Sequence, residues 1–312
     1  MKRTELSKLL FEKRPYYMIM AASTSVVWAF AFPLIKLGIA EFDIAASDTG
    51  AKTLFAGIRF FAAGMVVVAV SAFSGKKLTD AKKGGLPLAF LLGLVNTALH
   101  YFCYYIGLSN QSGSRSAVID SMSTFILILA ACAVFPDENF TAKKGIGCLL
   151  GFSGILLVNA GGGSSAFSLS GDGMLMMSAL FSAMGGILTR IVTKRMNSYT
   201  VTGISLGFGG LLLIVSGIVM GGRLPFPSLF GAFILCCLVG ISVYGFSVYN
   251  KLISCAPVGE IAIFSSLIPI LGVTFSCLLL KEQFRLKYIA AGLLVAVGIF
   301  VINHTDLRSI DK

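Results

Sequence analysis

Ten long apolar stretches take up most of this sequence and constrain its fold more than any other feature. Each is continuously apolar over roughly the 20 residues that a membrane-spanning helix needs, whereas a strand of a membrane barrel alternates over about ten. We predict spanning helices at 16–37, 53–72, 87–107, 115–135, 143–160, 172–191, 198–220, 227–249, 258–279 and 286–303. The chain is therefore expected to be an all-α integral membrane protein, with no room for a soluble catalytic domain.

Composition and charge support this class. Of the 312 residues, 56% are hydrophobic and 12% are charged, against about 45–50% and 25% in soluble domains. The net charge of +11 would favour a nucleic-acid partner if the basic residues shared one polar face, but they lie between the apolar runs. The seven cysteines show no Cys-x-x-Cys motif and no Cys/His pairing at metal spacing. We expect no nucleic-acid partner, no metal and no cofactor.

The lysines and arginines predict the orientation, because cytoplasmic loops carry an excess of both. With the N-terminus inside, seventeen basic residues fall in the cytoplasm and seven fall outside, while Arg59 lies within a span. Both termini are therefore predicted to be cytoplasmic, in a multi-pass protein of the cell membrane. The cytoplasmic leader, 1–15, superficially resembles a signal peptide, but the apolar run after it is too long for one.

The sequence also contains an internal repeat. An ungapped shift of 144 residues aligns 91–159 with 235–303 and matches polar residues as well as apolar ones, among them Ser121 with Ser265 and Glu138 with Glu282. We predict a first five-helix repeat at 16–160, a connecting loop at 161–171, a second five-helix repeat at 172–303 and a cytoplasmic tail at 304–312. Because five is odd, the second repeat enters the membrane from the opposite side. Inverted repeats of this kind are typical of alternating-access transporters.

Several short motifs resemble one known family. They are the first-span segment from Trp28 to Lys36, Arg59-Phe60, Pro269, and the paired Glu138-Asn-Phe and Glu282-Gln-Phe. Together they are similar to the EamA-type drug/metabolite transporters over nearly the whole chain. The resemblance implies ten helices around a central cavity, with substrate handled mainly by spans three, four, eight and nine. One departure is that Phe125 stands where the ninth span has Pro269, so the helix break expected by symmetry is predicted to be missing in the first repeat.

The third span carries a polar stripe of Asn96, His100 and Tyr104, spaced by four residues and so on one helical face. Such a stripe faces either a cavity or another helix, where polar residues join spans by hydrogen bonds. The repeat sets His100 against Tyr244, so we expect these two on opposite walls of one cavity. The histidine could titrate near neutral pH or simply donate a hydrogen bond.

The fourth span carries a second polar face, formed by Ser116, Asp120, Ser123 and Thr124. An acid near the middle of a span costs roughly 2.5–3.5 kcal/mol on insertion scales, so Asp120 is a functional candidate by default. As a protonatable carboxylate it could couple substrate efflux to proton entry. The alternative is that Asp120 forms a buried ion pair with Arg59. Such an ion pair would also be consistent with gating.

Other residues receive narrower roles. Glu260, at the inner mouth of the ninth span, is predicted to be a gate residue. Glu138 and Glu282 are predicted to cap helices or fix helix hairpins, and Lys36 and Arg115 to snorkel at outer helix ends. The complete set of predicted substrate-binding residues is Asn96, His100, Tyr104, Asp120, Ser123, Tyr244 and Phe264, with Asp120 and Arg59 as coupling residues.

The preferred interpretation is a secondary transporter that exports or exchanges a small metabolite, with amino acids or related compounds as the leading guess. We expect it to work in lipid as a monomer or homodimer and not to be an enzyme. A static channel or packing subunit stays open as an alternative. An intramembrane enzyme is less favoured, because its site would have to be built on His100 and Asp120.

Overall fold

The computed structural model describes residues 11, 13–73, 84–136, 138–159, 167–226, 228–255, 261, 263–283 and 285–308. Within these ranges the chain is almost entirely helical and contains no strand. Seven helices are long and apolar enough to cross a membrane by length and composition, and two shorter apolar helices, Leu267–Leu280 and Leu286–Ile302, follow them. The predicted all-α membrane fold is confirmed.

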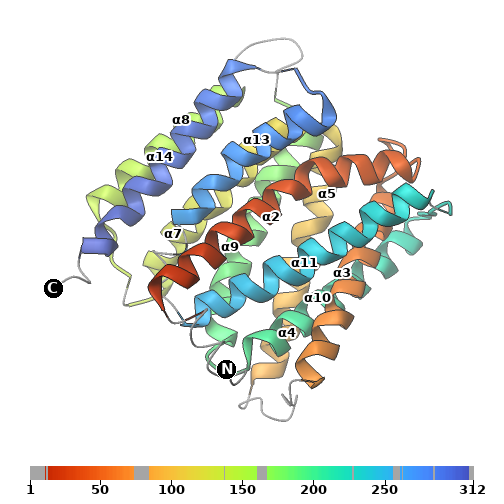
Figure 1. The fold of residues 1–312 in the computed structure, drawn as a ribbon, viewed down its shortest axis with the longest axis horizontal. Coiled ribbons are helices and arrows are strands. Elements are labelled where there is room, and N and C mark those ends of the chain that lie inside the picture. The colour runs from red at the N-terminus through yellow and green to blue at the C-terminus, as the bar shows by residue number, and fades with distance from the viewer. Residues whose placement is uncertain are drawn as a thin grey trace.

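The described residues form ten helical spans, five in each half (Figure 1). The first five are α2 (Arg14–Glu41), α3 (Thr49–Phe73), α4 (Gly85–Leu92) with the π-helix η2 (Gly93–Leu99) and α5 (His100–Asn110), α6 (Gly113–Asp120) with α7 (Met122–Val134), and α8 (Ala142–Asn159). The second five are η4 (Leu169–Gly173) with α9 (Met174–Val192), α10 (Ser198–Val219), α11 (Leu229–Cys255), η5 (Ile263–Ser266) with α13 (Leu267–Leu280), and α14 (Leu286–Arg308).

The helix contacts follow the symmetry of two inverted repeats. Helix α2 packs against α11 and α13, and its counterpart α9 packs against α5 and α7. Helices α3 and α8 pack against their own counterparts, α10 and α14, and α6 of the fourth span packs against α13 of the ninth. In Figure 1 the α8–α14 pair forms one edge of the molecule and the α3–α10 pair the opposite edge. Helices from both halves therefore surround the middle of the bundle.

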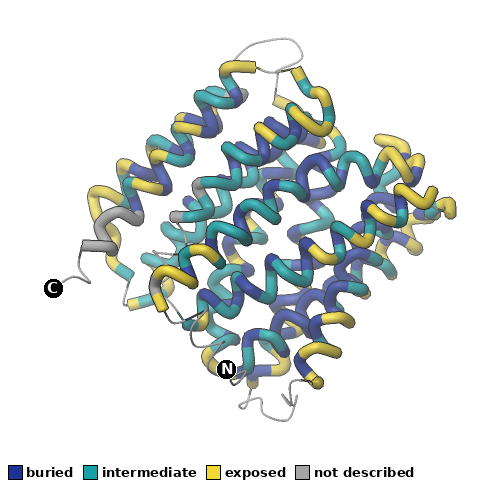
Figure 2. The backbone as a smooth tube through the Cα atoms, in the orientation of Figure 1, coloured by how far each residue is buried: buried dark blue, intermediate teal, exposed yellow. Residues whose placement is uncertain are grey.

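Burial is distributed as a membrane protein requires. Figure 2 shows buried positions along the inner faces of the helices and exposed ones on the outer faces and at the ends. Large apolar side chains are exposed on the edge helices, including Leu149, Leu156, Val215, Val219, Leu293 and Phe300. In water such contiguous apolar faces would need a covering partner, and in a bilayer the lipid tails cover them.

The fourth span corrects one expectation. Helix α6 ends at Asp120 and α7 begins at Met122, so the first repeat does contain a break although it has Phe125 in place of a proline. The Ser121 hydroxyl donates to the Val118 carbonyl, and the Thr124 N–H bonds only three residues back, to the Ser121 carbonyl, at 3.1 Å. A serine side chain that competes for backbone groups loosens a helix in this way. The 144-residue shift places this break against η5 in the ninth span.

Glycines allow the α3–α10 crossing to be very close. A methyl group on Gly64 would collide with the backbone of Gly207, whereas a methyl group on Gly207 would only touch the Gly64 Cα at 3.9 Å. We expect Gly64→Ala to lower the free energy of unfolding by about 1–3 kcal/mol, because two backbones must separate. Thermal unfolding in detergent measures this. Gly207→Ala is the matched control and should be near neutral, so equal losses in both variants would contradict the packing argument.

Candidate substrate site

A cavity of about 160 Å³ lies between the two repeats near the middle of the bundle. Helices α2, α3, α9 and α11 contribute to its walls, together with the third, fourth and ninth spans. Six of the predicted site residues line it, namely Arg59, Asn96, His100, Tyr104, Asp120 and Ser123. The polar stripe of the third span and, except for the buried Ser116, the polar face of the fourth span therefore face one common space.

His100 both lines the cavity and anchors α5 to α9. Its Nδ1 lies 3.0 Å from the Ser178 carbonyl oxygen, which can only accept, so Nδ1 carries the proton. Nε2 is then the ring nitrogen left for a ligand. The ring stacks on Tyr104 with centroids 5.8 Å apart and meets Tyr101 edge-on at 4.2 Å. His100 therefore both faces the cavity and joins two helices by a hydrogen bond, so the two alternatives for this stripe are true together.

Asp120 is the most unusual group in the cavity. It is the last residue of α6, beside the break at Ser121, and its Oδ1 is buried with no hydrogen-bond partner. A carboxylate so placed needs a proton or a cation, and the cavity that it lines is the side from which either can reach it.

Arg59 does not pair with Asp120, so the ion-pair alternative is wrong. Its Nε donates to the Leu238 carbonyl at 3.1 Å and to the Ser242 hydroxyl at 2.9 Å, and its Nη1 donates to the Tyr105 hydroxyl at 3.1 Å. These bonds hold α3 against α11 and α5. The guanidinium lies in the cavity wall and its residue is 2% exposed.

Tyr244 and Phe264 lie elsewhere, which corrects the expected opposition of Tyr244 and His100. The Tyr244 hydroxyl is 2.6 Å from the Ser23 hydroxyl, and both aromatic rings pack on a separate apolar cluster that includes Leu252. The physical reason is helix phase. The third span contains the π-helix η2, which changes the face presented by the residues after it, while α11 is α-helical throughout. Glu260 lies outside the described residues.

The positions of α11 that do face the cavity are Phe246, Tyr249, Asn250 and Ile253. They stand at helical intervals of three and four residues, and this spacing was the available signal in the sequence. Trp28 of α2 packs against this face, with ring centroids 5.6 Å from Phe246 and 4.9 Å from Tyr249. Gly245 leaves room for it, because a methyl group there would collide with the indole Nε1. One wall of the cavity is therefore aromatic.

Arg115 does not have the role predicted for it. It does not snorkel but forms a buried, two-pronged ion pair with Asp172 of η4, through Nε to Oδ1 at 2.7 Å and Nη2 to Oδ2 at 2.8 Å. The two side chains are 2% and 0% exposed. The Asp172 carboxylate also accepts from Gln111 Nε2 and from the Ser168 N–H. This pair joins the fourth and sixth spans at one end of the bundle, away from the cavity.

Comparison with known proteins agrees with this architecture. The model of the EamA-like transporter family matches residues 15–160 and 169–304. The uncharacterized transporter YvbV of Bacillus subtilis is 25% identical over 288 residues, covering 91% of this chain and 90% of its own. The chloroplastic WAT1-related protein At3g02690 of Arabidopsis thaliana is 27% identical over 266 residues, covering 80% and 62%.

A solved structure described only as a crystal structure of a protein superposes with a TM-score of 0.71 at 14% identity, covering 94% of this chain and 97% of that one. At this identity the likeness concerns the fold alone. The family match spans nearly all of the sequence, and the structure supplies the apolar helices that it requires. The chain is a multi-pass membrane protein that belongs to the EamA-like transporter family.

Proposed function

We propose that this protein is a secondary active transporter that works by alternating access and exports or exchanges a small polar or amphipathic metabolite, such as an amino acid, in a proton-coupled cycle. The observation that carries the proposal is Asp120, a carboxyl group in the cavity whose Oδ1 is buried without a partner. A group that must hold either a proton or a cation can exchange one for the other. That exchange is the simplest way to couple two fluxes.

The rest of the cavity supports a substrate with an apolar part and a few polar groups. Trp28, Tyr101 and Tyr249 offer ring faces, which favour apolar or cationic groups. Ser123 and His100 Nε2 offer hydrogen bonds. Arg59 is the one cationic side chain in the described lining, which disfavours a substrate with the charge of a phosphate.

Counterflow in proteoliposomes tests the transporter against the static-pore alternative. A thermal-shift screen of purified protein against amino acids, nucleosides and amines first selects a ligand, because a compound that binds only the folded state raises its apparent stability. We expect uptake of that labelled ligand to saturate and to rise several-fold when vesicles are preloaded with the unlabelled compound. Uptake that stays linear with concentration and ignores preloading would indicate a pore.

We also propose the location and orientation of the protein. It lies in the plasma membrane with both termini in the cytoplasm. Lys194 and Phe226 flank α10 and are both exposed, Phe226 completely. In a background without native cysteines, we expect Phe226→Cys to react with an impermeant maleimide in intact cells and Lys194→Cys to react only after lysis. The reverse pattern would place the termini outside.

A further inference from the structure

Glu282 reaches from the second repeat to the start of a helix in the first. Its carboxylate accepts from the Gly113 N–H at 2.6 Å, from the Ser114 N–H at 3.1 Å and from the Ser114 hydroxyl at 2.7 Å. Helix α13 ends at Leu280, and Lys281 adopts a φ of 52°, a left-handed conformation that is uncommon for a non-glycine residue. This reversal places Glu282 directly after the helix end. We call Glu282 with its bonds to Gly113 and Ser114 the latch.

The latch is a strong contact for its size. The first N–H groups of a helix have no partner within the helix, and the positive end of the helix dipole favours a carboxylate. Hydrogen bonds to an ionised acceptor are roughly twice as strong as neutral ones. Ser112 caps α6 from within the first repeat, through the Arg115 N–H, so the latch adds a cap that comes from the other repeat.

Other contacts join the same short segment to its surroundings. The Lys36 ammonium donates to the Gln111 carbonyl at 2.5 Å, and Arg115 pairs with Asp172. Below the latch, α6 and α13 cross closely through small residues. A methyl group on Gly272 would come within 2.6 Å of the Ala117 Cβ, and one on Gly113 within 2.5 Å of the Ser276 hydroxyl. This end of the bundle is therefore closed by α6 and α13.

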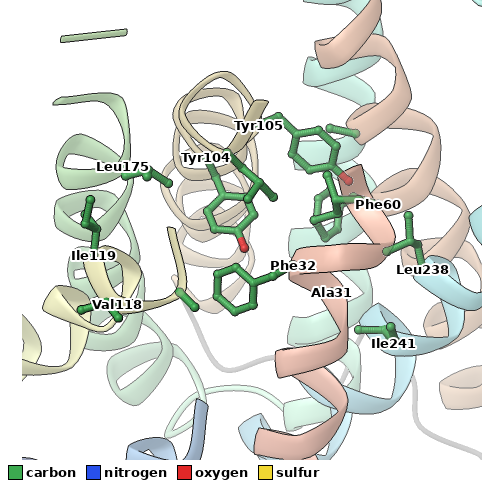
Figure 3. Close-up of a cluster of buried hydrophobic side chains, with 14 of the residues drawn as sticks. Ala31, Phe32, Phe60, Tyr104, Tyr105, Val118, Ile119, Leu175, Leu238 and Ile241 are labelled. Carbon is green, nitrogen blue, oxygen red and sulfur yellow. The ribbon is translucent and has the colours of Figure 1, made fainter. Parts of the chain in front are cut away.

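A packed apolar layer separates the latch from the cavity. Along α5 the order is Tyr104 at the cavity, then Leu108, then Gln111, and along α6 it is Asp120, then Val118, then Ser114. Leu108 and Val118 are fully buried. Figure 3 shows the side chains of Val118, Ile119 and Leu175 grouped beside the facing rings of Phe32 and Tyr104, whose centroids lie 6.1 Å apart. Passage of a solute at this end would require this packed layer to open.

The opposite end of the bundle contains the repeat counterpart, Glu138, in a different arrangement. Its carboxylate pairs with Lys144 at 3.0 Å and with Arg190 at 3.1 Å. Arg190 lies 18 residues along the sixth span from Asp172, or roughly 27 Å at helical rise. The small residues Gly272 and Ser276 correspond to Ile128 and Cys132 in the first repeat. The two small residues at the α6–α13 crossing therefore have larger counterparts in the first repeat.

We propose that Glu282 is a positioning residue that holds the N-terminus of α6 against α13, keeps this end of the cavity closed, and must release it for the cavity to open there. The inference rests on the proposed alternating access for its role in a cycle. Release exchanges three protein hydrogen bonds for contacts with water, which an end exposed at the membrane surface can supply. Glu138, whose described partners are Lys144 and Arg190, lies at the opposite end of the bundle and serves as the matched control.

Labelling of Ser116→Cys tests the latch without any substrate. Ser116 is fully buried on α6, one turn below Gly113, and cysteine is nearly isosteric with serine. In a background lacking native cysteines, in nanodiscs, we expect Glu282→Gln to raise the rate of reaction with a maleimide about tenfold and Glu282→Ala to raise it further, because the closed state loses charge-assisted bonds. Glu138→Gln should leave the rate unchanged. Equal rates in all variants, with wild-type melting and monodispersity, would overturn the proposal.

A disulfide provides the second measurement. The Ser114 hydroxyl lies 3.7 Å from the thiol of native Cys277, so Ser114→Cys places two sulfurs close enough to bond when this end is closed. This variant loses the hydroxyl bond to Glu282 but keeps the two N–H bonds, so both proteins that are compared carry it. With copper phenanthroline as oxidant, we expect rapid cross-linking in the protein with Glu282 and cross-linking about tenfold slower with Glu282→Gln. Unchanged cross-linking would count against the latch. Because neither readout involves transport, a latch response in a protein that fails the counterflow assay would refute only the proposed function.

Discussion

Asp120→Asn is expected to abolish proton-driven accumulation of substrate while preserving exchange at equal pH. Asparagine keeps the shape and hydrogen bonding of the side chain but cannot bind and release a proton. One pH unit corresponds to about 1.36 kcal/mol per proton, so a one-for-one exchange across two units sustains a concentration ratio of about 100. In the variant this ratio should fall to one. Proteoliposomes with and without an imposed pH gradient measure both quantities.

Ser123→Ala is the matched control, since Ser123 lines the same cavity from the start of α7 but does not titrate. It should change substrate affinity without removing the response to the gradient. Wild-type accumulation by Asp120→Asn would show that the carboxyl group is dispensable for coupling. A defect in Asp120→Asn cannot be attributed to loss of an ion pair with Arg59, because Arg59 bonds to Leu238, Ser242 and Tyr105 rather than to Asp120.

The fold could be predicted because lipid leaves a chain few choices. A continuous apolar run long enough to span has to be helical, and five spans per repeat is an odd number, which forces inversion. The cavity-facing stripes of the third and fourth spans followed from the helical spacing of their polar residues. Asn96, His100 and Asp120 could therefore be placed on inward faces before any contact was known.

The errors arise where one position depends on a change of helix phase or on a distant partner. Tyr244 was paired with His100 by counting residues, but the π-helix Gly93–Leu99 alters the phase of only one of the two helices. The break at Ser121 depends on a hydrogen bond of the serine side chain, and no proline marks the break in the sequence. Arg115 looked like a snorkelling residue because its partner, Asp172, is 57 residues away.

That ion pair supports the prediction with the largest effect on stability. Arg115→Met should lower the free energy of unfolding by about 3–5 kcal/mol, because it leaves the fully buried Asp172 carboxylate without its cation. The double variant Arg115→Met/Asp172→Leu should recover most of this loss, since a buried pair replaced by apolar groups of similar volume is often neutral. Equilibrium unfolding in detergent of the two single variants and the double variant gives the coupling energy.

Lys144→Met provides the comparison at the other end of the bundle. Its partner Glu138 is 26% exposed and keeps a second cation in Arg190, so the loss should be below about 1 kcal/mol. If the losses of the two single variants at Arg115 and Asp172 simply added in the double variant, the two side chains would be acting independently. The contact between the fourth and sixth spans would then depend on packing around Leu175 and not on the ion pair. If the two charges are coupled, removing both costs less free energy of unfolding than the sum of the two single losses.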